Sequence, residues 1–167
     1  MATFTLRSTR HALIVTLAEL ELEFSLDDGG LRALRRPGGP DVIGRGAPHT
    51  GVDVSLAETG WLSQRSFARY LNHFLYDIPG GVEIVIVVGL GPLKIYDRYR
   101  AFGSFITRRI SIENTGDDEL ALCGVRLTSA CRNAVASKRR QMSSVRVCRL
   151  PVCAAIRIIV TGRTHRR

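Results

Sequence analysis

Apolar and polar residues alternate strictly between Glu19 and Leu26. In an extended strand this period of two places the leucines and Phe24 on one face and the glutamates on the other. A helix would scatter the same leucines around its circumference, so the pattern predicts a half-buried antiparallel strand. Asp27 to Gly30 then supplies residues that tolerate positive φ, and Leu31 to Leu34 resumes the alternation. Together these segments predict a β-hairpin.

The same signal recurs along the chain at a spacing of roughly ten residues. Further predicted strands are Val52 to Leu56, Val82 to Val88, Leu93 to Ala101, Phe105 to Glu113 and Leu120 to Leu127. A turn at Asn114 to Asp118 is expected to return Leu120 to Leu127 as the partner of the strand before it. Arg36 to Gly51 is rich in Gly and Pro and predicts a loop. Ser63 to Leu75 is compatible with a strand pair or a short helix. The fold class predicted from this pattern is all-β, an antiparallel β-sandwich.

The charges divide the chain into two segments. All fifteen acidic residues lie at or before Glu119, whereas the last 48 residues carry ten Arg, one Lys and no carboxylate. We expect residues 1–130 to form the sandwich domain and residues 131–167 to be an irregular basic tail. Three interpretations of the tail remain open: a stretch read out of frame after a frameshift near residues 128 to 135, a disordered cationic tail, or an arm that binds nucleic acid or another polyanion.

The sequence shows no arrangement typical of catalysis or metal binding. Asp27 and Asp28 lie in a predicted turn, where Asp is favoured for local hydrogen bonding, and Asp97 lies inside a predicted strand with nothing to pair it. The four histidines and four cysteines lack the spacing of metal ligands. We therefore predict no catalytic residue, no metal and no cofactor. No apolar run approaches the roughly 20 residues of a membrane span, so a cytoplasmic protein with no membrane partner is expected.

Trp61 stands out as a candidate binding residue, with Arg65, Arg69 and Tyr70 downstream of it. Proteins often hold sugars by stacking an aromatic ring on the pyranose and binding its hydroxyls with planar donors. Trp61 and Arg65 are therefore the candidate sugar contacts. The alternative is that Trp61 packs in the sandwich core or at a subunit contact.

The stretch from Leu93 to Leu122 resembles the N-terminal β-supersandwich of α-galactosidase-like enzymes, glycoside hydrolase family 36. The residues that carry this resemblance run from one strand through a turn toward a Ser-Ala pair: Ile106, Arg108, Ile112, Asn114, Gly116, Asp117, Ser129 and Ala130. Leu22 to Leu31 is also similar to the opening hairpin of galactose-mutarotase-like sandwiches. The resemblance implies a truncated supersandwich covering about residues 20 to 130.

In the family, the catalytic aspartates lie in a later barrel that this chain does not contain. The resemblance therefore implies a non-catalytic N-terminal fragment of a carbohydrate-active enzyme, without glycosidase activity of its own. Its implied roles are scaffolding, subunit contact within a homo-oligomer and the shaping of a sugar pocket. The competing hypothesis is a small basic binding protein whose C-terminal arm contacts nucleic acid or another polyanion, with binding that weakens steeply as salt rises.

Overall fold

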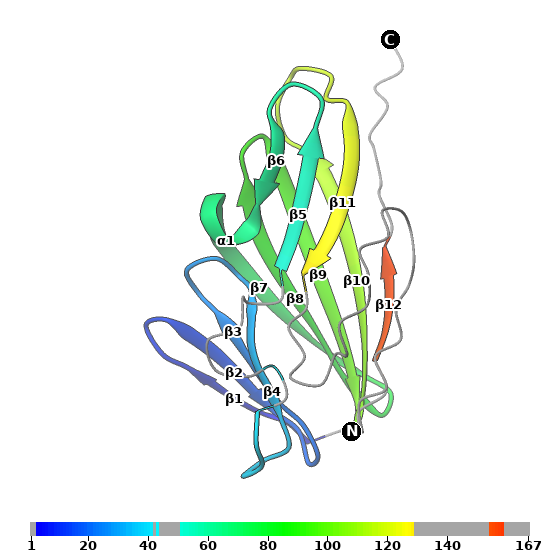
Figure 1. Cartoon of the computed structure of the whole chain (residues 1–167). Coiled ribbons are helices and arrows are strands. Elements are labelled where there is room, and N and C mark those ends of the chain that lie inside the picture. The colour runs from blue at the N-terminus through cyan, green and yellow to red at the C-terminus, as the bar shows by residue number, and fades with distance from the viewer. Residues whose placement is uncertain (1–2, 42, 44–50, 129–153, 159–167) are drawn as a thin grey trace.

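The computed structural model describes residues 3–41, 43, 51–128 and 154–158, which form three β-sheets and one helical turn. The four-stranded and three-stranded sheets lie on the same side of the five-stranded sheet (Figure 1). A single hydrophobic cluster contains buried residues from all three sheets. The prediction of an all-β, antiparallel sandwich is confirmed.

The N-terminal sheet is antiparallel, with the strands in sequence order: β1 (Thr5–Ser8), β2 (Ala12–Thr16), β3 (Glu21–Ser25) and β4 (Leu31–Arg35). The predicted hairpin is formed by β3 and β4, and the alternation holds, because Leu22 and Phe24 are fully buried while Glu21 and Glu23 are not. Gly29 in the turn has a φ of 74°, and a Cβ there would lie 2.2 Å from Cγ1 of Val88. Glycine is required at this position both for the turn and for its packing on β8.

The five-stranded sheet has the order β12-β10-β9-β8-β7. Its strands are β7 (Ala68–Ile78), β8 (Gly81–Leu90), β9 (Leu93–Phe102), β10 (Phe105–Asn114) and β12 (Ala154–Ile158). The pairing is antiparallel from β7 to β10 and parallel between β10 and β12. Residues on both faces of β8 are buried, Val85 and Val87 as well as Ile84 and Ile86, as its β-branched sequence predicts for an interior strand.

The third sheet has the order β11-β5-β6 and comprises β5 (Gly51–Leu56), β6 (Gly60–Ser63) and β11 (Leu122–Thr128). The prediction that Leu120 to Leu127 pairs with the preceding strand is wrong, because β11 pairs with β5. The connection from β10 to β11 passes from the five-stranded to the three-stranded sheet. At its start Thr115 N–H donates to Pro92 O in the turn between β8 and β9, and at its end Ala121 O accepts from Ala57 N–H, which follows β5.

Of the two alternatives for Ser63 to Leu75, the short helix is the one the structure shows, followed by a single strand. The helical turn α1 (Gln64–Phe67) leads directly into β7, which continues to Ile78. Gln64 is buried in this turn, where its side chain bridges the three-stranded and four-stranded sheets: Val52 N–H donates to Oε1 at 2.7 Å, and Nε2 donates to Asp28 O at 2.8 Å.

Five residues of the predicted basic tail are described, and they form β12 beside β10. The remainder of residues 131–167 lies outside the described residues, as do Ser129 and Ala130 of the family-like segment and most of the predicted loop between Pro40 and Gly51. The three interpretations of the tail, including the polyanion-binding arm, therefore stay predictions. In the described part of the chain, no helix is long and apolar enough to cross a membrane.

Candidate functional site: the Trp61 surface

Trp61 lies on the outer face of the three-stranded sheet. Pairing places both Trp61 of β6 and Gly124 of β11 beside Ser55 of β5, so these three residues form one row across the sheet. A Cβ at Gly124 would lie 3.5 Å from Cη2 of the indole, which shows that the ring extends across the sheet over this glycine. Trp61 remains 49% exposed. The alternative that it packs in the sandwich core is therefore excluded.

The next row of the same face holds Arg126 of β11 opposite Asp53 of β5. Nε and Nη2 of Arg126 donate to Oδ2 of Asp53 at 3.0 and 2.9 Å. The guanidinium carbon lies 4.7 Å from the centroid of the Trp61 ring, within the range of a cation–π interaction. Asp53 is buried, whereas the Arg126 side chain is largely exposed. We call Trp61, Asp53, Ser55 and Arg126 the Trp61 surface.

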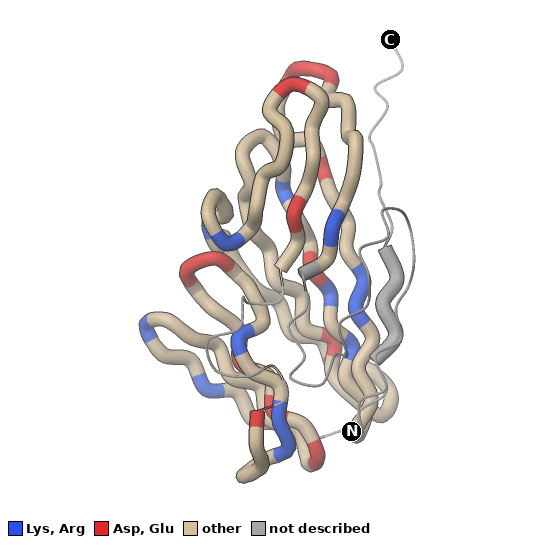
Figure 2. Tube along the Cα trace, viewed as in Figure 1, with Lys and Arg blue, Asp and Glu red and all other residues tan. Residues whose placement is uncertain are grey.

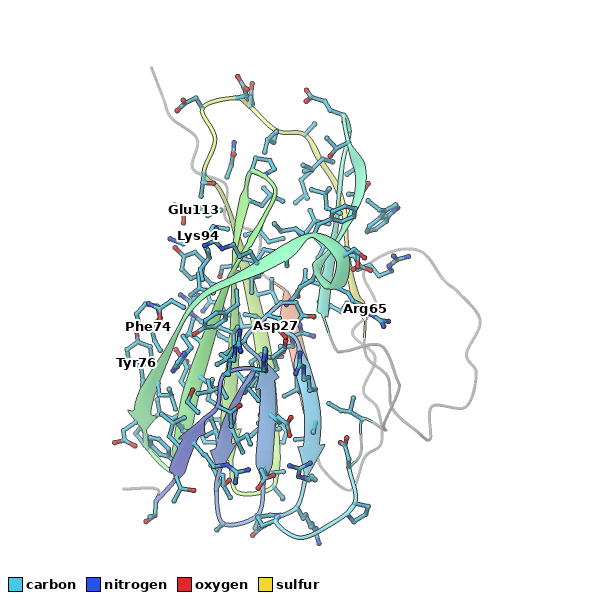
Figure 3. The ribbon with its side chains drawn as sticks, turned by 90° about the vertical axis from the view of Figure 1, so that its left-hand side faces the viewer. Asp27, Arg65, Phe74, Tyr76, Lys94 and Glu113 are labelled. Carbon is cyan, nitrogen blue, oxygen red and sulfur yellow. The ribbon has the colours of Figure 1, made fainter. Side chains whose placement is uncertain are left out.

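The sequence-based choice of Trp61 and Arg65 as sugar contacts stays a prediction, and the structure places the two residues in different surroundings. Arg65 lies in α1 and is exposed, and Figure 3 shows it at the margin of the molecule. Among the described residues, the guanidinium that lies over the Trp61 ring is that of Arg126 and not that of Arg65. Tyr70 packs against the core, and its hydroxyl lies 2.5 Å from Nδ1 of His73. Sequence proximity could not find Arg126, because sheet pairing brings it to Asp53 from 73 positions away.

The carboxylates singled out in the sequence have structural partners. Asp28 Oδ1 accepts from Gly30 N–H at 3.0 Å, which is the local turn bonding that was predicted. Hydrogen bonds from His11 and Arg32 hold the pKa of Asp27 below its usual value. The expectation that nothing pairs Asp97 is wrong, since the side chain of Arg108 forms a buried ion pair with it.

A hollow of about 230 Å³ is a second candidate site. The turn between β5 and β6 and the connection from β10 to β11 line it, and its polar residues are Glu58, Thr59, Asn114 and Asp118. The Asn114 amide is already used within its loop, because Nδ2 donates to Asp118 O and Oδ1 accepts from Gly116 N–H. These bonds make Asn114 a loop-stabilising residue, so the Trp61 surface is the stronger candidate. Among the described residues, no group of three or more potential metal ligands occurs.

No protein-family model, curated protein or solved structure matches this chain. The resemblance to glycoside hydrolase family 36 therefore stays a prediction, and the functional argument depends on the geometry of the Trp61 surface.

Proposed function

We propose that this chain is a non-catalytic β-sandwich module of a carbohydrate-active enzyme, similar to the N-terminal domain of α-galactosidase-like enzymes, and that the Trp61 surface contacts sugar. The observation that carries the proposal is the half-exposed indole of Trp61 beside a guanidinium that Asp53 holds in place. A sugar ring offers a face of C–H groups that packs on an aromatic ring, and a rim of hydroxyls that needs donors and acceptors.

The Trp61 surface is organised before any ligand arrives. Arg126 uses Nε and Nη2 for Asp53, which fixes the plane of the guanidinium and leaves other N–H groups of its five for hydroxyl oxygens. Side chains that are already ordered lose less conformational entropy when a ligand binds. Such a site suits a neutral polyol, because Asp53 already balances the charge of Arg126 and the ligand needs no charge of its own.

The remaining roles in this proposal follow from the family resemblance. The sandwich would serve as a scaffold and subunit contact for a catalytic domain elsewhere in the parent enzyme. The purified chain is accordingly expected not to hydrolyse an aryl α-galactoside. Hydrolysis that rises in proportion to the purity of the chain would contradict the non-catalytic assignment.

Intrinsic fluorescence tests the sugar contact directly, because Trp61 is the only tryptophan in the chain. We expect galactose and the α-galactoside raffinose to change its emission in a saturable way. A small, open surface predicts a dissociation constant of roughly 1 mM, equivalent to about 4 kcal/mol of binding free energy. An emission that stays constant up to high millimolar concentrations of both sugars would contradict the proposal.

Calorimetric titration of variants separates the Trp61 surface from exposed aromatic residues in general. Trp61→Ala is expected to abolish sugar binding, and Arg126→Ala to weaken it about tenfold through the loss of a charged hydrogen-bond donor. Phe67→Ala is the matched control, because Phe67 is also an exposed aromatic residue, at 62%, and lies six positions away. Equal losses in Trp61→Ala and Phe67→Ala would show that the Trp61 surface is not the binding site.

A further inference from the structure

The outer face of the five-stranded sheet is the face that points away from the other two sheets. In Figure 3 the labelled side chains of this face, Phe74, Tyr76, Lys94 and Glu113, project together to the left, away from the four-stranded sheet. Figure 2 shows that blue positions are frequent on the neighbouring strands β9 and β10. The outer face is therefore partly basic: Val85 and Val87 of β8 are buried on it, whereas Phe74, Tyr76 and Arg109 are exposed.

Two arginines lie directly opposite each other on this face. The register of β9 and β10 pairs Arg98 with Arg109, so both side chains leave the sheet from the same cross-strand site. Like charges in directly opposite positions destabilise an antiparallel pair. The fold thus concentrates positive charge in one row of the sheet.

The carboxylates of the outer face are engaged elsewhere. Glu83 forms an ion pair with Arg100. Glu113 accepts a hydrogen bond from the Tyr96 hydroxyl at 3.0 Å and stands opposite Lys94 in the register. Within the described part of the chain, no carboxylate forms an ion pair with Arg98 or Arg109. The arginine pair therefore has no counter-charge among the described residues.

Arg98 is nevertheless held in a defined position. Its Nη1 donates to Oγ of Ser111 at 3.1 Å, and its guanidinium carbon lies 5.6 Å from the centroid of the Tyr96 ring. Arg109 is exposed and stands between Thr107 and Ser111 along β10, so hydroxyl groups flank the pair. The pair therefore combines the oriented guanidinium of Arg98 with the exposed guanidinium of Arg109, and Thr107 lies on the same face of β10.

We propose that Arg98 and Arg109 bind a phosphate or sulfate group on the outer face of the five-stranded sheet. Guanidinium groups donate pairs of parallel N–H bonds to tetrahedral oxyanions, and two guanidinium groups together match a dianion. The bound anion removes the repulsion that the register imposes on the pair. The site is separate from the Trp61 surface, which lies on another sheet, so neither proposal depends on the other.

Thermal unfolding of the full chain tests the anion site. Inorganic phosphate at low millimolar concentration is expected to raise the melting temperature above that in sodium chloride of equal ionic strength, because a ligand that binds only the folded state stabilises it. Low concentrations matter, since sulfate and phosphate at high concentration stabilise proteins without specific binding. Inorganic sulfate and a sugar phosphate form parallel arms: a tighter sugar phosphate would identify an ester as the ligand, and equal affinities would identify the free oxyanion.

The variant Arg109→Gln should change the melting temperature and the phosphate affinity in opposite directions. Without phosphate it should melt at a higher temperature than the wild type, because the opposed charge is gone. Its affinity for phosphate, measured by calorimetry, should fall at least about tenfold. Lys94→Gln is the matched control, because Lys94 is a cation of the same face that stands opposite Glu113 in the register. This variant should keep the wild-type phosphate response. A phosphate response that survives in Arg109→Gln, or that is absent from the wild type, would overturn the proposal.

Discussion

Arg108 and Arg109 are neighbours in the sequence but lie on opposite faces of β10, and the two faces give an arginine side chain different environments. Arg108 points into the sandwich, where it is 5% exposed and forms a two-point ion pair with Asp97, itself 1% exposed. Arg109 points outward and stands opposite another arginine. Water screens a charge on the outer face, whereas the interior accepts a charge only with a partner. The comparison shows that moving one residue along the strand decides whether an arginine needs an ion-pair partner.

Three hydrogen bonds hold the interior ion pair together. Arg108 Nε and Nη2 donate to the two carboxylate oxygens of Asp97 at 2.8 and 2.6 Å, and the Tyr99 hydroxyl donates to Oδ2 at 2.9 Å. Burial by itself lowers the pKa of Arg108, but the attraction of Asp97 and Tyr99 outweighs it and raises the pKa above its ordinary value. Tyr99 in turn packs edge-on against Phe24 of the four-stranded sheet, with centroids 5.0 Å apart. The pair therefore belongs to the contact between two sheets.

The largest effect is expected when the interior pair is broken from one side. Asp97→Asn leaves the guanidinium of Arg108 buried without a counter-charge, which typically destabilises a protein by about 3–5 kcal/mol. Urea denaturation followed by circular dichroism measures the change. Because a domain of this size is stable by only about 5–15 kcal/mol, the variant should unfold at a much lower urea concentration.

Two further variants show whether the cost comes from burial. Glu83→Gln makes the same chemical change at the exposed ion pair with Arg100, and should alter stability by less than about 1 kcal/mol. The double variant Asp97→Leu, Arg108→Met replaces both charges and should recover much of the stability lost in Asp97→Asn. If Glu83→Gln were as damaging as Asp97→Asn, the contrast between the two faces would be wrong.

The sequence predicted the strands well, because alternation is a local signal. Leu22 and Phe24 point inward as their spacing indicates, and the turns at Gly29 and Gly80 lie where glycine permits a positive φ. The short strands β1 and β2 were missed, since Ala12 to Thr16 is apolar at most positions and its two faces do not differ.

Pairing between distant segments was not predictable in the same way. Alternation says which face a residue occupies, but not which strand will lie next to it. Thus the pairing of β11 with β5, and with it the contact of Arg126 with Trp61, is absent from any local pattern. The same holds for Asp97 and Arg108, whose pairing requires the inward faces of β9 and β10 to be aligned.

An intermediate effect is expected where the interior holds a neutral polar group. Gln64→Leu removes the amide that accepts from Val52 N–H and donates to Asp28 O, so both backbone groups lose their partner. Leaving buried backbone groups unsatisfied typically costs about 1–3 kcal/mol. Urea denaturation should place this variant between Asp97→Asn and Glu83→Gln. Ser66→Ala in the same turn is exposed and serves as the control, with no change expected. A loss in Gln64→Leu as large as that in Asp97→Asn would mean that charge is not what distinguishes the interior pair.

The smallest effect is expected at His73, which lies on the inward side of β7 at the edge of the sheet and is only partly buried. Burial lowers the pKa of His73 below its ordinary 6.5 and raises the pKa of Tyr70. At a pH between the folded and the unfolded pKa of His73, the unfolded chain therefore binds a proton more readily than the folded one. Stability should be complete above about pH 6.5, fall as the pH is lowered through that value, and level off below the folded pKa.

The contact with Tyr70 gives this pH dependence a structural cause. With Nδ1 unprotonated, the Tyr70 hydroxyl donates to it at 2.5 Å, and protonation of the ring removes that acceptor. Urea midpoints measured from about pH 7.5 to 5.5 should decline in the wild type and stay nearly constant in His73→Phe. The exposed His11 provides the control, because His11→Gln should retain the decline. If the urea midpoint of His73→Phe declined with pH as steeply as that of the wild type, the pH dependence would belong to another group. The inner face at the edge of the sheet would then tolerate a charge as well as the outer face does.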